Sequence, residues 1–180
     1  IGTYLTYEDD PATGRGIRPY PYTTDKNVNP QTYGDLTTGS LSVPHGVGSV
    51  WATTLWDMYW ALTGGVPERN LPALGFRQNL SDMTQPLSGN QIALRLVMDG
   101  LKLQPCDPSF VEARDAILEA DRVNFGGAHA CYIWWAFARR GLGVNADDGG
   151  DGLDVTEAFR DYLRPLLGGL PEVEQLMLPR

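Results

Sequence analysis

Apolar residues recur at three- and four-residue steps from Gly46 onward, which is the spacing of one face of an α-helix. The first apolar stripe consists of Val47, Val50, Trp51, Leu55, Met58 and Leu62. Gly64 and Gly65 then predict the end of that helix. Ser88 and Gln91 form a capping-box pattern before a second apolar run that ends near Leu103. Because the second run is apolar on nearly every side, the sequence predicts that it lies at the centre of the core.

Two further helices follow in the pattern. Asp107 and Pro108 are typical of an N-cap and a first helical turn, and they precede an apolar stripe that ends at Leu118. A fourth helix is predicted to begin near Ala130 and to end at Arg139-Arg140-Gly141, where basic residues and glycine suit a helix C-terminus. The predicted fold class is therefore mainly α.

The chain divides into three parts. Residues 1–44 are rich in Gly, Pro, Thr, Asn and Tyr, and they predict a long ordered loop whose aromatic side chains pack onto a surface. Residues 45–145 carry the predicted helices. Residues 146–180 form an acidic Gly/Asp loop followed by a tail with apolar residues at helical spacing. The first residues, Ile1-Gly2, follow no initiator Met or signal core, so we expect that targeting information precedes residue 1 or has been removed.

Composition narrows the classes of partner. A chain of 180 residues has the usual length of one domain, and its 42% hydrophobic content is too high for an intrinsically disordered protein. The formal net charge of −8 would repel a phosphate backbone and an anionic lipid surface. No apolar run approaches the roughly 20 residues that cross a bilayer. We therefore expect neither nucleic acid nor a membrane as a partner.

The count of histidines limits the chemistry of the chain on its own. A catalytic zinc site needs about three protein ligands, and these often include two His one helical turn apart. The chain has only His45 and His129, which do not form such a pair. Ser49 does not lie in the Gly-x-Ser-x-Gly turn that exposes a nucleophile. The sequence therefore predicts no metal site in this chain and no zinc peptidase activity of its own.

Four titratable residues have both a functional and a structural interpretation. His45 precedes the first helix and lies beside glycines, which suits contact with a ligand, although a lone His is more often structural. His129 favours the structural interpretation more strongly. Asp57 and Asp99 lie in apolar helices, where acids usually pair with a backbone group or with an arginine such as Arg95 or Arg114. The Trp51, Trp56, Tyr59 and Trp60 group indicates core and domain-contact surface more than a sugar-binding platform.

The only two cysteines, Cys106 and Cys131, allow two interpretations. An even count suits a disulfide in an oxidising compartment, where closing such a loop would contribute about 3 kcal/mol. Two buried thiols are the alternative. No CxxC spacing indicates a metal or redox site.

Several motifs in order resemble the fungalysin family of secreted zinc metallopeptidases. The resemblance lies in Val43–Ala52, Leu101–Phe110 and Trp135–Gly143, and it extends to the loop segments Gly16–Tyr22 and Asn29–Tyr33. It covers roughly the first 145 residues. In that family, which is similar in architecture to thermolysin, an upstream helix carries a His-Glu-x-x-His pair and a later Gly-Glu-x-Trp-Ser-Asp segment supplies the third zinc ligand. This sequence contains neither element.

The resemblance implies that residues 1–145 are the C-terminal helical lobe of a metallopeptidase catalytic domain, a thermolysin-like C-terminal helical subdomain with a long N-terminal loop region. The lobe would form one wall of the active-site cleft. Its partners would be the N-terminal zinc-binding half of the same protein and a peptide substrate. Zn²⁺ would belong to the full-length parent, and the chain alone would bind none and be inactive. The parent would be secreted.

The resemblance also assigns roles to two residues. His45 matches the His that donates to the oxyanion of the tetrahedral intermediate, while a Glu outside this chain acts as the base for a zinc-activated water. Arg18 aligns with an Arg that binds a substrate backbone carbonyl. Thermolysin-like enzymes orient the His with an acid a few residues upstream, but Gly39–Pro44 contains none and Asp35 is a distant substitute. A non-catalytic peptide- or partner-binding module is the alternative function, and an unrelated helical scaffold is a third.

Overall fold

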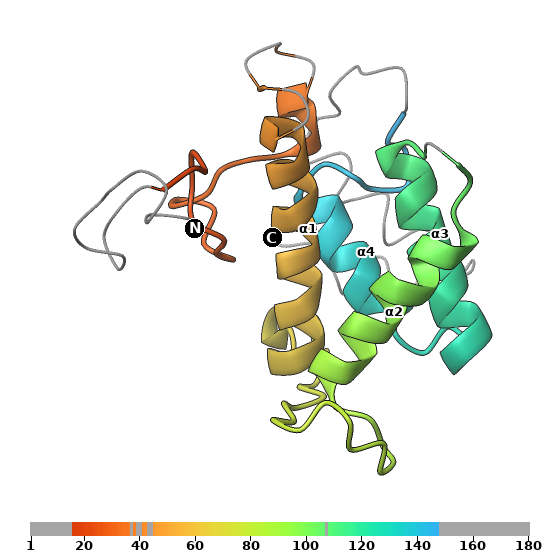
Figure 1. Cartoon of the computed structure of the whole chain (residues 1–180). Coiled ribbons are helices and arrows are strands. Elements are labelled where there is room, and N and C mark those ends of the chain that lie inside the picture. Colours follow the sequence, from red (N-terminus) through yellow and green to blue (C-terminus); the bar gives the residue numbers. More distant parts are fainter. Residues whose placement is uncertain (1–15, 37, 39–40, 43–44, 107, 148–180) are drawn as a thin grey trace, which may run out of the picture.

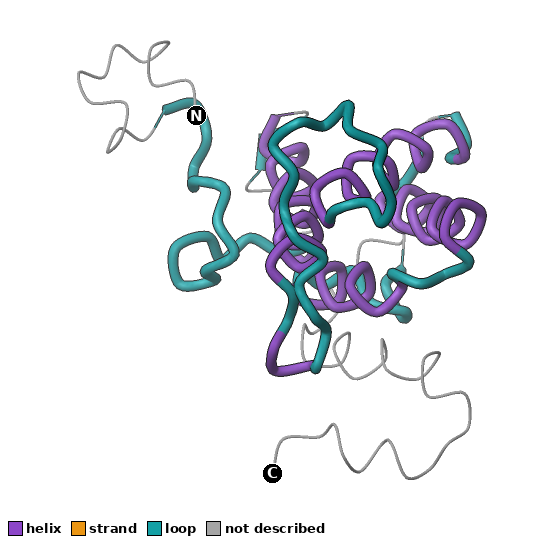
Figure 2. The backbone as a smooth tube through the Cα atoms, turned by 90° about the horizontal axis from the view of Figure 1, so that it is seen from below, coloured by secondary structure: helices purple, strands orange, loops and turns teal. Residues whose placement is uncertain are grey.

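The computed structural model describes residues 16–36, 38, 41–42, 45–106 and 108–147. Within these ranges the chain forms the α-helices α1 (His45–Gly64), α2 (Gly89–Leu103), α3 (Phe110–Phe125) and α4 (Ala130–Arg139), shown in Figure 1. The described part also contains the short 3-10 helices η2 (Tyr33–Leu36) and η3 (Pro67–Arg69). The described part contains no strand, and the tube in Figure 2 shows only helix and loop. The mainly α prediction is confirmed.

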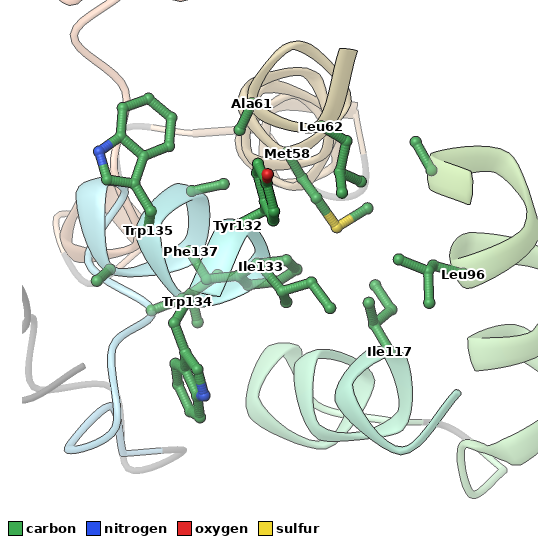
Figure 3. Packing of buried hydrophobic residues seen from close by; sticks show 14 of the residues in the cluster. Met58, Ala61, Leu62, Leu96, Ile117, Tyr132, Ile133, Trp134, Trp135 and Phe137 are labelled. Atoms are coloured by element: carbon green, nitrogen blue, oxygen red, sulfur yellow. The ribbon is translucent and has the colours of Figure 1, made fainter. Parts of the chain in front are cut away.

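Helix α4 is the centre of the core. It lies behind α1 and α2 in Figure 1, and all its residues from Tyr132 to Ala138 are buried. Tyr132, Ile133 and Phe137 project toward α1, α2 and α3, where they meet a group of apolar side chains (Figure 3). That group includes Met58, Leu62, Leu96 and Ile117. Trp134 and Trp135 point to different sides of α4, so that this one helix contacts packing partners all round.

The prediction that the second helix lies at the centre of the core is wrong. Helix α2 buries Ile92, Ala93 and Leu96 but leaves apolar side chains about half exposed on its other side. These side chains are Leu94, Met98, Leu101 and Leu103. Helix α2 packs on α1 and α3 and lies at the front of the molecule in Figure 1, where its outward-facing apolar side chains remain exposed. An apolar composition all round was therefore not sufficient to place it at the centre.

Several helix ends match the predicted signals, and the start of α3 does not. Ser88 precedes α2, and its backbone N–H donates to Gln91 Oε1 at 3.2 Å, as the capping box predicts. Arg140 and Gly141 follow α4, and Gly141 has the positive φ of 84° that the C-terminal glycine predicts. The N-cap of α3 is different: it is Ser109, not Asp107, which lies outside the described residues.

The correction at α3 has a clear physical reason. Ser109 Oγ accepts from the Glu112 N–H at 3.1 Å, and Glu112 Oε2 accepts from the Ser109 N–H at 2.9 Å. This reciprocal pair satisfies two backbone donors at the helix start, which a single Asp N-cap does not. The Ser-Phe-Val-Glu pattern was visible in the sequence and indicates the same start.

The described part of the N-terminal loop packs on the bundle, as its aromatic content predicts. Tyr33 is buried, and the centroid of its ring lies 5.8 Å from that of Phe110. Its hydroxyl donates to the Asp147 carbonyl at 2.9 Å. Tyr22 lies 6.4 Å from Trp56 on α1. The predicted tail helix over residues 155–167 lies outside the described residues. None of the described helices is both long and apolar enough to cross a bilayer.

Candidate functional site

His45 is the first residue of α1, and its side chain is exposed. The first turn is fixed by the Ser42 carbonyl, which accepts from the Gly46 N–H at 2.6 Å and from the Val47 N–H at 3.2 Å. A Cβ atom at Gly46 would lie 3.1 Å from Leu41 Cβ, so this glycine allows the preceding chain to approach the helix closely. At the start of α1, the positive end of the helix dipole lies beside the His45 side chain.

Arg18 lies against the same helix start. Its Nη1 donates to the His45 carbonyl oxygen at 3.3 Å, across 27 positions of sequence. The Arg18 side chain is half-buried, and its Nε is buried without a hydrogen-bond partner among the described residues. The two site residues indicated by the sequence are therefore neighbours in space. The sequence predicted a role for each but not that they touch.

Asp35 does not orient the His45 imidazole. Its Oδ2 accepts from the Thr32 N–H at 2.7 Å and from Thr32 Oγ1 at 3.3 Å, which stabilises the start of η2. Within the described ranges, the His45 side chain has no hydrogen bond at all. An orienting acid for His45 is therefore not found in this part of the chain.

Polar side chains join the N-terminal loop to the first half of α1. Asn29 Nδ2 donates to the Pro21 carbonyl at 2.9 Å and to Thr53 Oγ1 at 3.1 Å, and Gln31 Nε2 donates to Ser49 Oγ at 2.9 Å. Asn29, Gln31, Ser49 and Thr53 are all buried. Ser49, which lacks the sequence pattern of a nucleophile, therefore has a structural role between the loop and α1.

A buried charged cluster lies beneath this loop. Arg140 is fully buried, and its Nε donates to Asp57 Oδ2 on α1 at 2.7 Å. Its two terminal nitrogens donate to three loop carbonyls, those of Thr23, Asn29 and Gln31, at 3.2, 2.7 and 3.0 Å. Arg139 adds a bond from Nη2 to the Thr24 carbonyl at 2.6 Å. Asp57 is therefore structural, as expected, but its partner is Arg140 and not Arg95 or Arg114.

The charges in this cluster are unbalanced. Lys26 Nζ donates to the Arg139 carbonyl at 3.1 Å, so three cations surround the single carboxylate of Asp57. Burial lowers the pKa of Lys26, and the positive charges of Arg140 and Arg139 lower it further. Burial raises the pKa of Asp57, while the hydrogen bond and charge of Arg140 act in the opposite direction. Desolvation is thus the main electrostatic cost at this junction.

The remaining titratable candidates are structural. His129 Nδ1 lies 2.8 Å from Asp121 Oδ1, and the His129 N–H donates to Asp121 Oδ2 at 2.9 Å, which ties the end of α3 to the start of α4. Asp99 on α2 accepts from Lys102 Nζ at 2.7 Å and lies 3.5 Å from Arg95 Nε. The Lys102 hydrogen bond lowers the pKa of Asp99. Pairing of Asp99 with Arg95 was expected and is confirmed.

The proposed disulfide between Cys106 and Cys131 is contradicted, because both thiols are free. Cys106 lies before α3 and is exposed, whereas Cys131 lies beyond α3 in the first turn of α4 and is half-buried. Helix α3 lies between them in the sequence, and its 16 residues span roughly 24 Å at 1.5 Å per residue. A disulfide requires Cα atoms within about 7 Å. The even count of cysteines was therefore not a signal of pairing.

Within the described residues, no group of three or more His, Cys, Asp or Glu side chains could hold a metal ion, so these residues do not fit a zinc ion. A groove of about 400 Å³ lies beside α2, lined mainly by Leu80, Met83, Leu87, Gln91 and Leu94. This groove contains neither His45 nor Arg18.

Sequence reasoning missed the residues that build the junction beneath the site. Arg140, Asn29 and Gln31 resemble surface or loop residues in the sequence, and all three are buried. A signal was available in the Trp51–Tyr59 stretch, where the side chains at Thr53 and Asp57 lie on the buried side of α1. Polar residues at helical spacing on the side of a helix that is otherwise buried predict a polar partner segment.

Comparison with known proteins identifies the family. The sequence profile described as fungalysin metallopeptidase (M36) matches residues 1–146. An extracellular metalloproteinase MEP of Pyricularia oryzae is 49% identical over 137 residues, which are 75% of this chain and 20% of that protein. An extracellular metalloproteinase 10 of Coccidioides posadasii is 44% identical over 131 residues, or 73% of this chain and 20% of that protein.

An extracellular metalloproteinase mep of Aspergillus fumigatus is 45% identical over 131 residues, again 73% of this chain and 20% of the relative. The chain thus spans about a fifth of the length of the curated relatives that it matches. The helices of the structure are those expected of a C-terminal, mainly α lobe in such a peptidase. With a family match over residues 1–146 and identities of 44 to 49%, the chain belongs to the fungalysin family of metallopeptidases.

Proposed function

We propose that this chain is part of a secreted, zinc-dependent metalloendopeptidase that hydrolyses peptide bonds, and that it forms one wall of the active-site cleft. The observation that carries the proposal is the contact between Arg18 and the first residue of α1, His45. The names of the relatives support an extracellular metalloproteinase. Residues 1–145 are the C-terminal lobe, with residues 1–44 as its loop-rich part and residues 45–145 as its helices, and residues 146–180 are an acidic Gly/Asp loop followed by a tail.

His45 supplies an N–H donor to the oxygen of the scissile carbonyl. As a nucleophile adds to the carbonyl carbon, negative charge develops on that oxygen, and a donor fixed in advance stabilises this charge more than the neutral substrate. The exposed position of His45 leaves its imidazole accessible to a substrate. The N-terminal end of α1 adds a favourable dipole for the same negative charge.

Arg18 binds a backbone carbonyl of the substrate. A guanidinium carries five N–H donors, and the His45 carbonyl accepts from Nη1 alone. Arg18 therefore keeps donors for a peptide while it remains fixed against α1. A binding role of this kind changes KM more than kcat.

The zinc ligands lie in the N-terminal half of the same protein, where the family resemblance puts the His-Glu-x-x-His pair, and the described residues of this chain contain no group that could hold the ion. The partner of this lobe is therefore that half, and the substrate lies between them. Isolated residues 1–180 bind no stoichiometric zinc and cleave no peptide. The alternative, a peptide- or partner-binding module without catalysis, predicts instead a full-length protein that binds peptides but does not cleave them.

The test compares the two histidines of this chain in the full-length protein. His45→Ala is expected to lower kcat by about 10²–10³-fold with little change in KM, the cost of removing one oxyanion donor. His129→Ala is the matched control, because His129 is bonded to Asp121 away from α1 and should keep its kcat in the folded fraction. Zinc content, measured by mass spectrometry, should be unchanged in both variants.

An active wild-type enzyme whose His45→Ala variant keeps full kcat would refute the role of His45. A full-length protein that binds peptide but cleaves none would support the alternative function. Tight zinc binding by residues 1–180 alone would contradict the division of the site between two halves.

A further inference from the structure

The buried guanidinium of Arg140 lies where three parts of the lobe meet. Arg140 follows α4, its Nε donates to Asp57 on α1, and its terminal nitrogens donate to carbonyls of the N-terminal loop. Its own carbonyl accepts from the Tyr33 N–H at 2.7 Å. Arg140 thus forms hydrogen bonds, through both its side chain and its backbone, to the N-terminal loop that also carries Arg18.

One set of contacts runs from Arg140 toward Arg18. Arg140 Nη1 holds the Asn29 carbonyl, and the Asn29 side chain donates to the carbonyl of Pro21, three residues from Arg18. Arg140 Nη2 donates to the Thr23 carbonyl, and Arg139 Nη2 donates to the Thr24 carbonyl. The backbone on the C-terminal side of Arg18 is therefore fixed at several consecutive points.

A second set of contacts runs from Arg140 toward His45. Arg140 Nη1 also holds the Gln31 carbonyl, and Gln31 Nε2 donates to Ser49 Oγ in the opening turns of α1. Ser49 Oγ in turn donates to the Gly46 carbonyl, next to His45. The same guanidinium therefore connects to both residues of the proposed site.

We infer that Arg140 and Asp57 are positioning residues, which set the loop carrying Arg18 against the helix start that carries His45. This inference rests on the function proposed for His45 and Arg18. A planar guanidinium with several directed N–H donors fixes carbonyls at defined angles, which an apolar contact does not. Neither Arg140 nor Asp57 touches the substrate, because both side chains are buried.

Arg140→Lys in the full-length peptidase tests this inference. Lysine keeps the positive charge but has no planar guanidinium group. Fewer carbonyls of the loop therefore accept a hydrogen bond from this side chain. Because displacements of about 1 Å cost up to a hundredfold in rate, we expect kcat to fall on the order of tenfold with zinc content unchanged. Arg139→Lys is a milder second variant, since Arg139 is partly exposed and holds only the Thr24 carbonyl of the loop.

Arg114→Lys is the matched control. Arg114 is also a buried arginine, and it donates to the carbonyls of Leu142 and Gly143 but to none in the N-terminal loop. It should reproduce any general loss of stability while leaving kcat unchanged. Amide hydrogen exchange in residues 16–36 should accelerate in Arg140→Lys and not in Arg114→Lys, which reports positioning without any measurement of activity.

The pair of variants Arg140→Lys and His45→Ala separates positioning from simple destabilisation. If Arg140 acts through His45, adding Arg140→Lys to His45→Ala should lower kcat less than twofold. The same tenfold loss in both backgrounds, or faster exchange with unchanged kcat, would overturn the inference and leave the proposed function intact. No effect of His45→Ala would instead refute the proposed function, and this inference with it.

Discussion

The pair α2–α3 and the junction of the N-terminal loop with α1 and α4 are held together by different forces. Leu96 and Ala93 on α2 and Ile117 on α3 are buried apolar side chains, and the axes approach closely at Gly100, where a Cβ would lie 2.9 Å from Ile117 Cγ1. The ion pair of Asp99 and Lys102 on α2 lies near the solvent, with Lys102 largely exposed. The stabilisation here is mainly apolar burial.

The loop junction shows the opposite arrangement. Asp57 and Arg140 are fully buried there, together with Asn29, Gln31, Ser49 and Thr53. Irregular backbone cannot satisfy its own carbonyls as a helix does, so buried side-chain donors must satisfy them. The regular part of the lobe therefore depends on buried apolar area, whereas the part that carries the proposed site depends on directed polar contacts.

Disruption of the polar junction should cause the greatest loss of unfolding free energy. Asp57→Ala leaves the buried Arg140 cation beside Arg139 and Lys26 without their carboxylate, and removing one partner of a buried pair costs about 3–5 kcal/mol of unfolding free energy. Glu119→Ala is the control on α3, where its exposed ion pair with Arg122 should contribute under about 1 kcal/mol. Urea denaturation of the purified protein measures both. Equal losses would remove the distinction between the two regions.

The next effect tests the one-sided burial of α2. Leu96→Ala removes a fully buried side chain and should cost about 2–5 kcal/mol, because a cavity remains among the helices. Met98→Ala, two residues away on the same helix, removes a side chain that is 56% exposed and should change stability by less than about 0.5 kcal/mol. Thermal or urea unfolding gives the difference. A large loss for Met98→Ala would show that this side of α2 is covered in solution.

The sequence predicted the regular elements because periodic burial leaves a periodic pattern. The ends of α1 at Gly64 and of α4 at Arg139 and the start of α2 after Ser88 agree with the structure, since glycine and capping residues act locally. Central and peripheral helices were confused because composition does not reveal whether the apolar side chains of a helix are covered on every side. Helix α4 carries Trp134 and Trp135 on different sides and fills that role in place of α2.

The candidate site was predictable only in part. His45 and Arg18 were identified by motif resemblance, but the 3.3 Å contact between them joins residues 27 positions apart and leaves no local pattern. The role of Arg140 was missed for a related reason. A basic residue at the end of a helix has a sufficient local explanation in the helix dipole, and only the structure shows that it is buried against a distant loop.

A smaller effect concerns the local signal at the start of α3. Ser109→Ala removes the oxygen that accepts from the Glu112 N–H and should cost about 1 kcal/mol. Ser81→Ala is a suitable control, because Ser81 is an exposed loop serine whose described hydrogen bond comes from its backbone N–H. Urea denaturation should resolve the two. If Ser109→Ala were as neutral as the control, another residue would have to start the helix.

The last prediction concerns the chemical reactivity of the two cysteines. Alkylation under non-reducing conditions should modify two thiols, and mass analysis should find Cys106 modified first because it is exposed. Burial raises the pKa of Cys131, so this thiol forms the reactive thiolate less readily than it would in the unfolded chain. Its alkylation should therefore be slow in the native protein. Denaturation in urea should abolish the difference, and a protein without any free thiol before reduction would contradict the unpaired state of both cysteines.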